Sequence, residues 1–252
     1  MRLPYQLGFL LLIHYLFGTT DAQLRIVGGV QTTISQRPPT LALMQSGKYY
    51  CAASLITTQH ALTAAHCLYD TPREVIIVIG GVTDLRYRSS GQRRRVERMW
   101  IPRAFNPTTK TRDVGVIKMV RPMVLGPNVA IMPLATTRAR GGARINVSGW
   151  GTTNERQKTG VDILRTVTVS VVPLRTCAQM YGNSARLTNT MMCAASRGRD
   201  ACAGDSGGPA INSNGEQVGI VSFGRGCAQP EFPGVYTDIR SVLPFIRRCM
   251  AR

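Results

Sequence analysis

Residues 200–209 read Asp-Ala-Cys-Ala-Gly-Asp-Ser-Gly-Gly-Pro. Ser206 follows Asp205 directly and lies on a glycine-rich turn. Such a turn can hold a serine hydroxyl and two backbone N–H groups around one point in space. Acyl transfer needs this arrangement, because the nucleophile must lie beside donors that stabilise an oxyanion. Taken alone, a Ser-Gly-Gly turn is equally consistent with an ordinary loop.

Two segments upstream carry further candidate catalytic residues. Residues 62–67 read Leu-Thr-Ala-Ala-His-Cys and contain His66, and Asp113 opens the apolar run Val-Gly-Val-Ile at residues 114–117. Each has a simpler interpretation, as a core histidine and as a turn residue at a strand end. Their order along the chain, after Arg-Ile-Val-Gly-Gly at residues 25–29 and before the Ser206 turn, favours a shared catalytic role.

These motifs together resemble the chymotrypsin-like serine protease family and, within it, the trypsin-like subgroup. The resemblance extends from residue 26 to about residue 252. The order His, Asp, Ser separates it from the subtilisin-like and α/β-hydrolase families, which use the same chemistry in other orders. The resemblance implies that Ser206 is the nucleophile, His66 the general base and Asp113 the residue that orients His66. It also implies an oxyanion hole made by the N–H groups of Gly204 and Ser206.

Length and composition agree with one domain of two packed halves, since the chain has 252 residues and 44% hydrophobic content. Short β-branched runs at residues 75–79, 114–120, 167–172 and 217–222 recur between Gly, Pro and Asn clusters, which predicts an all-β protein. Leu243, Ile246 and Met250 have helical spacing and predict a C-terminal helix over residues 241–250. The resemblance implies two antiparallel Greek-key β-barrels, with the active site in the cleft between them and a boundary near residues 130–142.

The N-terminus carries the features of a secretory signal. Residues 1–22 contain a basic start at Arg2, an apolar stretch over residues 7–17 and small or polar residues before Ala22. The apolar stretch is shorter than a membrane span requires. We therefore expect a signal peptide at residues 1–22, a propeptide at residues 23–25 and a peptidase domain at residues 26–252 of a secreted, extracellular protein without a membrane anchor. A buried N-terminal helix is the alternative interpretation.

Seven cysteines fit an oxidising compartment. The resemblance implies three disulfides, which are Cys51–Cys67, Cys177–Cys193 and Cys202–Cys227. Cys249 is left over, as a free thiol or as an intermolecular link. No metal site or cofactor is expected, because the chain after residue 22 keeps two histidines and has no Cys-x-x-Cys.

Substrate specificity is implied by the resemblance at Asp200, which corresponds to the acid at the base of the pocket for the residue before the cleaved bond. Gly224 and Gly234 occupy positions where the family keeps glycine, so a long Arg or Lys side chain can reach Asp200. Ala201 stands where trypsin has a hydroxyl residue, which predicts that Arg is preferred over Lys. In the segment Ser222-Phe223-Gly224, Phe replaces the Trp of trypsin and trims the wall of the site that receives the substrate backbone.

The resemblance also implies activation by proteolytic cleavage. The bond between Arg25 and Ile26 is itself a trypsin-type cleavage site, and cleavage there creates a new α-ammonium on Ile26. By resemblance this ammonium pairs with Asp205 and orders the oxyanion loop. The intact chain is thus expected to be an inactive zymogen, and autoactivation is consistent with its own specificity.

The charge is strongly basic, with a formal net charge of +18. Eight arginines fall between Arg73 and Arg103. They predict a surface that binds a heparin-like polyanion, or else a solvated basic surface without a dedicated partner. Two other functions are alternatives to proteolysis. One is a non-catalytic homologue that acts as a binding module, and the other is a secreted protein that binds polyanions. The principal expectation is a monomeric serine endopeptidase that acts on protein or peptide substrates and binds protease inhibitors.

Overall fold

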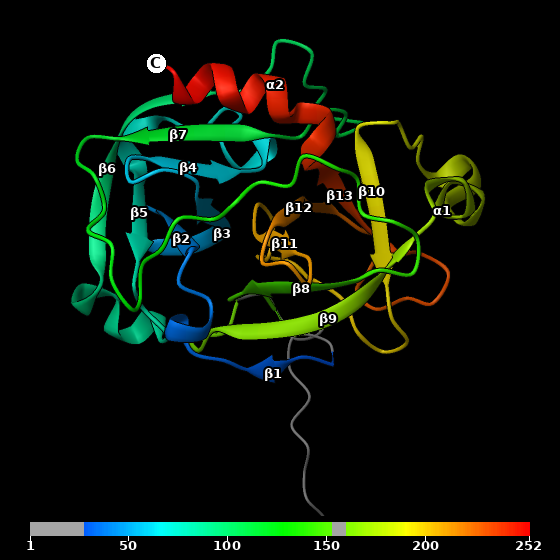
Figure 1. Ribbon diagram of the computed structural model, residues 1–252, viewed down its shortest axis with the longest axis horizontal. Coiled ribbons are helices and arrows are strands. Elements are labelled where there is room, and N and C mark those ends of the chain that lie inside the picture. Colours follow the sequence, from blue (N-terminus) through cyan, green and yellow to red (C-terminus); the bar gives the residue numbers. More distant parts are fainter. Residues whose placement is uncertain (1–27, 153–159) are drawn as a thin grey trace, which may run out of the picture.

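The computed structural model describes residues 28–152 and 160–252, which form two β-barrels side by side (Figure 1). The first barrel is closed by six antiparallel strands in the order β2-β3-β4-β7-β6-β5. These strands are β2 (Thr40–Gln45), β3 (Lys48–Leu55), β4 (His60–Thr63), β5 (Ile76–Gly80), β6 (Gln92–Trp100) and β7 (Gly115–Met119). The interior of this barrel is filled by completely buried side chains, which include Leu41, Leu43, Leu62 and Ile117. Burial of these apolar side chains stabilises the strands that carry them.

The second barrel follows in the chain and is also antiparallel. Its strands run in the order β9-β10-β13-β12-β11-β8, and an additional β8–β9 pairing closes the ring. They are β8 (Arg144–Gly149), β9 (Arg165–Val172), β10 (Met191–Ala195), β11 (Pro209–Ile211), β12 (Gln217–Phe223) and β13 (Gly234–Asp238). The short strand β1 (Val30–Gln31) pairs with β9 at the edge. β9 alternates buried and half-buried residues along its length, as a strand with one face in the core does.

In the described part of the chain two α-helices accompany the barrels, α1 (Leu174–Tyr181) and α2 (Ile239–Met250). α2 follows the last strand of the second barrel, yet Val242, Ile246 and Cys249 pack into the hydrophobic cluster of the first barrel. It therefore joins the two barrels, and it lies across the top of the molecule in Figure 1. The short 3-10 helices are Ile34–Gln36, Ala65–Cys67, Arg73–Val75, Leu85–Ser90 and Gly182–Ser184. No helix in residues 28–152 or 160–252 could span a membrane.

The expected architecture is confirmed, with two barrels and a C-terminal helix that begins two residues earlier than predicted. α1 is an addition that the sequence pattern did not indicate. Residues 130–142 lie in the connection between β7 and β8, where the chain passes from one barrel to the other. Three disulfides are present, Cys51–Cys67, Cys177–Cys193 and Cys202–Cys227, and Cys249 is a buried free thiol.

Candidate active site

The candidate catalytic residues come from both barrels and meet at the seam between them. His66 lies in the 3-10 helix that follows β4, and Asp113 lies just before β7. Ser206 lies in the loop between β10 and β11, and its carbonyl accepts a hydrogen bond from the N–H of Ala52 in β3 at 2.8 Å. A Cβ on Gly207 would lie 2.1 Å from Oγ1 of Thr63 in β4, so only glycine permits this approach. The serine loop is thereby held against the strands that lead to His66.

Asp113 is completely buried and binds His66 twice. Its Oδ2 lies 2.7 Å from Nδ1 of His66, and its Oδ1 accepts a hydrogen bond from the His66 backbone N–H at 2.8 Å. The hydroxyl of Ser222 donates to the same Oδ2 at 2.5 Å, and the Thr237 hydroxyl donates to the Asp113 backbone carbonyl at 2.8 Å. With Nδ1–H donated to the carboxylate, Nε2 of His66 keeps its lone pair and can accept a proton.

No side-chain hydrogen bond joins His66 to Ser206 in the described part of the chain. Their proximity rests on the backbone contacts of the serine loop with β3 and β4. Catalytic hydrogen bonds are often long before substrate binds. The lack of a hydrogen bond between His66 and Ser206 is therefore compatible with proton transfer between them in a substrate complex.

The peptide groups on both sides of Gly204 are fixed from opposite barrels. The N–H of Thr152 donates to the Ala203 carbonyl at 2.6 Å, and the Tyr49 hydroxyl donates to the Gly204 carbonyl at 2.7 Å. Because N–H and C=O point in opposite directions across a trans peptide, the first bond turns the Gly204 N–H away from Thr152. Gly204 has a φ of +93°, a conformation that favours glycine. The arrangement leaves the Gly204 N–H available to an oxyanion.

A cavity of about 380 Å³ opens beside Ser206. Its lining includes all of the predicted specificity residues, which are Asp200, Ala201, Ser222, Phe223, Gly224 and Gly234. A Cβ on Gly234 would lie 2.8 Å from Oδ1 of Asp200, and glycine there keeps the base of the cavity open. The Phe223 ring is half-buried and packs edge-on against Tyr181, with ring centroids 6.3 Å apart.

Asp200 lies at the base of this cavity and is only 3% exposed. Its Oδ2 accepts a hydrogen bond from the Ala228 N–H at 3.1 Å, whereas its Oδ1 has no hydrogen-bond partner among the described residues. Burial raises the pKa of the Asp200 carboxyl to about 7, against a weaker opposing effect of backbone N–H groups. A buried carboxyl with an unpaired oxygen is chemically suited to a cationic group that enters the cavity.

Asp205 is completely buried beside Ser206. Its two oxygens accept hydrogen bonds from the N–H groups of Gly151 and Cys202, each at 2.9 Å. Burial raises the pKa of Asp205 to about 6 in spite of these two bonds. No Lys or Arg within residues 28–152 and 160–252 forms an ion pair with Asp205. Arg25 and Ile26, the predicted activation residues, lie outside the described residues.

The sequence pattern does not indicate two further contributors to the site, Tyr49 and Thr152. Their partners are far away in the chain, 155 and 51 residues in these two cases, and no local pattern marks such contacts. The one group of described residues with metal-ligand proximity is Cys51, His66 and Cys67. Both of its sulfurs are joined in a disulfide and are therefore not free thiolates.

Comparison with known proteins agrees with this geometry. Residues 26–246 match the sequence profile of the family named Trypsin. Trypsin alpha of Drosophila melanogaster is 38% identical over 216 residues, which cover 85% of this chain and 83% of that protein. Seminase of the same species is 40% identical over 227 residues, which cover 89% of this chain and 81% of that protein.

Among solved structures, neuropsin, a serine protease expressed in the limbic system of mouse brain, matches with a TM-score of 0.81 and 30% identity. The match covers 88% of this chain and 98% of that one. The chain belongs to the trypsin family and is a serine endopeptidase. Membership in this family implies protein substrates and protease inhibitors as partners.

Proposed function

We propose that the chain is a secreted zymogen which, once cut between Arg25 and Ile26, hydrolyses peptide bonds after Arg and, less readily, after Lys. The observation that carries the specificity is the buried Asp200 at the base of a cavity that opens beside Ser206. A substrate side chain that reaches this carboxyl must be long and cationic to satisfy it. Its scissile carbonyl then lies next to Ser206.

The catalytic roles follow from the contacts around His66. Ser206 Oγ attacks the carbonyl carbon, and its proton passes to Nε2 of His66. As the C–N bond breaks, His66 returns that proton to the leaving amine, and an acyl-enzyme remains. Water, deprotonated by His66, then attacks the ester; the bond to Ser206 Oγ breaks, and His66 passes the proton to Oγ, which restores the serine. Asp113 holds His66 through Nδ1 and stabilises the imidazolium, while the N–H groups of Gly204 and Ser206 stabilise the oxyanion.

The preference for Arg over Lys rests on Ala201 in the lining of the cavity. An alanine there offers no hydroxyl to a compact ammonium, whereas a planar guanidinium can reach both oxygens of Asp200. An uncharged substrate would leave the buried Asp200 carboxyl without a cationic partner and would gain no charge-assisted hydrogen bond there.

The activation step is supported by the surroundings of Asp205. A buried carboxyl with a raised pKa would gain greatly from a cation beside it. We propose that the new α-ammonium of Ile26 is this cation, and that the pair orders the loop of Gly204 and Ser206. Secretion is supported by the signal-like residues 1–22 and by the three disulfides, which persist in oxidising compartments.

The test compares the purified chain before and after cleavage at Arg25–Ile26, on chromogenic peptides that end in Arg, Lys, Phe or Ala. We expect hydrolysis only after cleavage, with kcat/KM in the order Arg, Lys and then the uncharged residues, and none in Ser206→Ala. An Asp200→Ser variant should lose the preference for cationic residues. A folded, verifiably cleaved protein without activity would favour the non-catalytic binding module instead.

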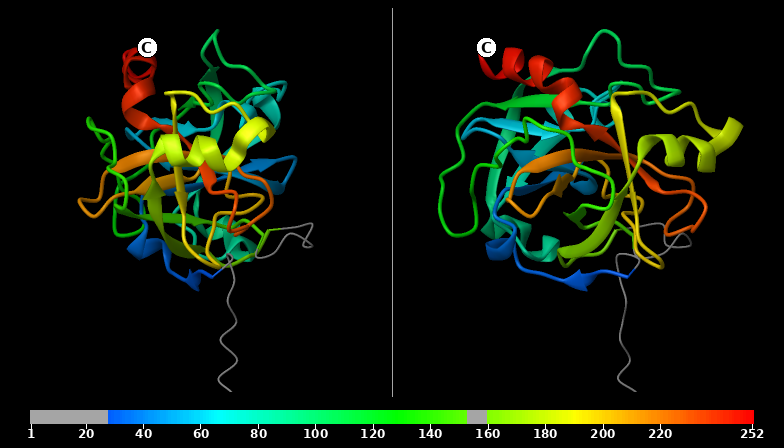
Figure 2. Two further views of the ribbon diagram at one scale, coloured as in Figure 1. Left: turned by 90° about the vertical axis from the view of Figure 1, so that its right-hand side faces the viewer. Right: turned by 45° about the vertical axis from the view of Figure 1, so that its right-hand side comes forward.

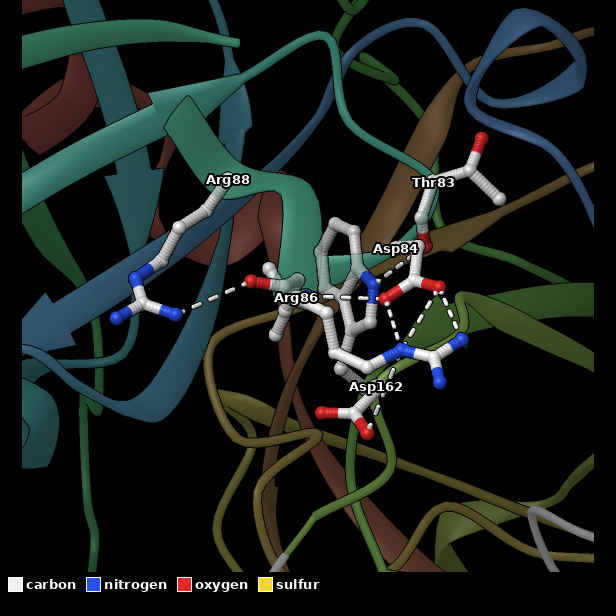
Figure 3. A network of polar contacts seen from close by, with 7 residues as sticks. Thr83, Asp84, Arg86, Arg88 and Asp162 are labelled. Atoms are coloured by element: carbon white, nitrogen blue, oxygen red, sulfur yellow. Dashed lines mark hydrogen bonds and ion pairs between the residues drawn. The ribbon is translucent and has the colours of Figure 1, made fainter. Parts of the chain in front are cut away.

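A second candidate function, polyanion binding, is supported by part of the basic segment between Arg73 and Arg103. Arg86 is neutralised by Asp84 at 2.5 Å, with Asp162 at 3.9 Å (Figure 3), and Arg73 pairs with Glu74. By contrast, no described acid pairs with the arginines that line a hollow of about 430 Å³ on β6, which are Arg93, Arg94, Arg95 and Arg121.

We propose that a heparin-like polyanion binds at this hollow. Retention on a heparin column that falls with salt, and that is lost when Arg93, Arg94 and Arg95 are changed to Ala, would support this. Equal loss of retention after removal of three arginines elsewhere would indicate bulk charge alone.

A further inference from the structure

A second concavity lies away from the Ser206 cavity, between α2 and the segment that links β6 to β7. Its volume is about 640 Å³, larger than the 380 Å³ of the cavity beside Ser206 and within the range of ligand sites. The two segments that border it rise on the same side of the molecule (Figure 2). We call this concavity the α2 groove.

The charged side chains that line the α2 groove are all positive. Its lining contains four arginines, Arg103 and Arg112 from the linking segment and Arg248 and Arg252 from the C-terminal end of the chain. None of the four forms an ion pair with an acidic side chain in the described residues, and no Asp or Glu lines the groove. Outside the lining, Lys118 donates a hydrogen bond to the backbone oxygen of Arg252 at 3.2 Å and pairs with Glu97 at 3.4 Å. The groove therefore attracts anions.

Apart from Ser241, its remaining lining is apolar. Trp100, Ile101 and Pro102 form one side, and Val242 and Phe245 form the other. Trp100 and Phe245 are only half-buried, so their rings are partly accessible from the groove. A ligand that fills this space buries apolar surface and at the same time brings negative charge to its rim.

The positive charge and the apolar walls of the α2 groove together indicate the chemistry of its partner. A second copy of the chain would bring a net charge of +18 against the same sign of charge, and association would be opposed. A sulfated glycan offers the negative charge but little apolar surface for the aromatic walls. We propose that the α2 groove is a docking site for an acidic peptide segment that carries aromatic or aliphatic side chains between its carboxylates, presented by a protein substrate or inhibitor. The proposal does not depend on the specificity at Asp200.

The two tryptophans of the chain allow binding to be measured directly. Trp100 lines the groove, whereas Trp150 is completely buried elsewhere. The probe is the peptide acetyl-Glu-Glu-Phe-Glu-Glu-Leu-amide, which offers no Arg or Lys, titrated into the full chain in the Ser206→Ala background. We expect saturable change in tryptophan fluorescence, and its disappearance in Trp100→Phe while a fluorescein-labelled probe still binds by anisotropy.

A matched pair of variants separates the groove from general basicity. Arg103→Gln with Arg248→Gln removes two charges from the groove, and Arg93→Gln with Arg121→Gln removes two charges from the hollow on β6. Because charge-assisted hydrogen bonds are among the strong ones, we expect Kd to rise about tenfold or more in the first and less than about threefold in the second. Near-UV circular dichroism confirms that both variants are folded.

Two outcomes would overturn the proposal. Equal weakening in both double variants would mean that the peptide senses only the net charge. Binding of a heparin hexasaccharide that depends on Arg103 and Arg248, with no binding of the peptide, would assign the groove to a sulfated glycan instead.

Discussion

Tyr49 links the two barrels through a single hydroxyl. It stands in β3 of the first barrel and donates to the carbonyl of Gly204 in the second at 2.7 Å. Its ring packs edge-on against Trp150, with centroids 5.9 Å apart, so the hydroxyl is held in place. The position of the oxyanion loop thus depends on a residue that takes no part in the chemistry.

We expect Tyr49→Phe to lower kcat of the cleaved enzyme about threefold to tenfold and to leave KM nearly unchanged. The reason is that one hydrogen bond of about 0.5–1.5 kcal/mol orients a donor that acts in the transition state. The matched control is Tyr50→Phe, because the buried Tyr50 hydroxyl has no hydrogen-bond partner among the described residues. Equal effects of the two variants on kcat would contradict a positioning role.

Asp200 makes substrate affinity depend on pH. A cation binds the ionised carboxylate, and with a pKa of about 7 in the free protein the carboxyl becomes protonated below neutrality. Binding of benzamidine to the cleaved Ser206→Ala protein should therefore be about 100-fold weaker at pH 5 than at pH 8. Calorimetric titration measures this dependence directly, and Asp200→Asn should abolish it. Affinity that stays constant over this range would refute the assignment of Asp200.

Among individual residues, the sequence predicted those that have short motifs around them. His66, Asp113 and Ser206 each stand in a recognisable local segment, and Asp200 has a fixed spacing to Ser206. Tyr49 was not predictable, since a tyrosine next to another tyrosine on a strand has no local signal. Only the folded chain shows that one hydroxyl meets a carbonyl 155 residues away and the other meets none.

At the scale of elements, the disulfides serve different parts of the molecule. Cys202–Cys227 joins the two walls of the cavity beside Ser206, since both cysteines line it. Cys177–Cys193 ties α1 to β10, and neither cysteine lines that cavity. Both close loops of similar size, with sequence separations of 25 and 16 residues, so their entropic contributions are comparable, about 3–4 kcal/mol.

Replacement of each pair by Ala should therefore separate stability from substrate binding. We expect both double variants to lose stability in urea, by amounts that are similar. Only removal of Cys202–Cys227 should raise KM for an Arg substrate, because the walls around Asp200 are then less constrained. The interpretation fails if removal of Cys177–Cys193 raises KM to the same extent.

The elements themselves were predictable where their hydrophobic pattern was strong. β7, β9 and β12 lie within two residues of the predicted runs, and α2 contains the predicted apolar face. α1 was missed because it has eight residues and buries only Cys177 and Tyr181. Thr and Cys are also weak helix formers, so packing against the second barrel, rather than local propensity, stabilises this helix.

For the whole molecule, Asp205 links activation to stability. In the uncleaved chain its pKa is about 6, above the ordinary value of 3.8. Because the pKa of Asp205 is higher in the folded than in the unfolded protein, its protonated carboxyl favours the folded state. This contribution to stability is fully present below about pH 4 and is lost as the pH rises through 6. The size of that loss is about 3 kcal/mol, since one pKa unit is about 1.4 kcal/mol. Pairing with the Ile26 ammonium would remove it.

Cleavage at Arg25–Ile26 should thus stabilise the protein more at pH 8 than at pH 4. Urea unfolding of the cleaved and uncleaved proteins measures the difference at each pH, in a Ser206→Ala, Asp200→Asn background because the charge of Asp205 also raises the pKa of Asp200. Uncleaved Asp205→Asn serves as the control and should show no loss of stability through pH 6 from this group. A stability difference that does not change with pH would exclude the proposed ion pair.

Covalent labelling of the nucleophile tests the role of Ser206 and the need for cleavage in one experiment. A fluorophosphonate probe reacts with an activated serine, which forms an O–P bond as fluoride leaves and the hydroxyl proton passes to His66. We expect the cleaved protein to gain the mass of one probe, located on Ser206 by peptide mapping, with no label in His66→Ala, in Ser206→Ala or in the uncleaved chain. Absence of label from the folded, cleaved protein, or label on another residue, would mean that Ser206 is not the activated nucleophile.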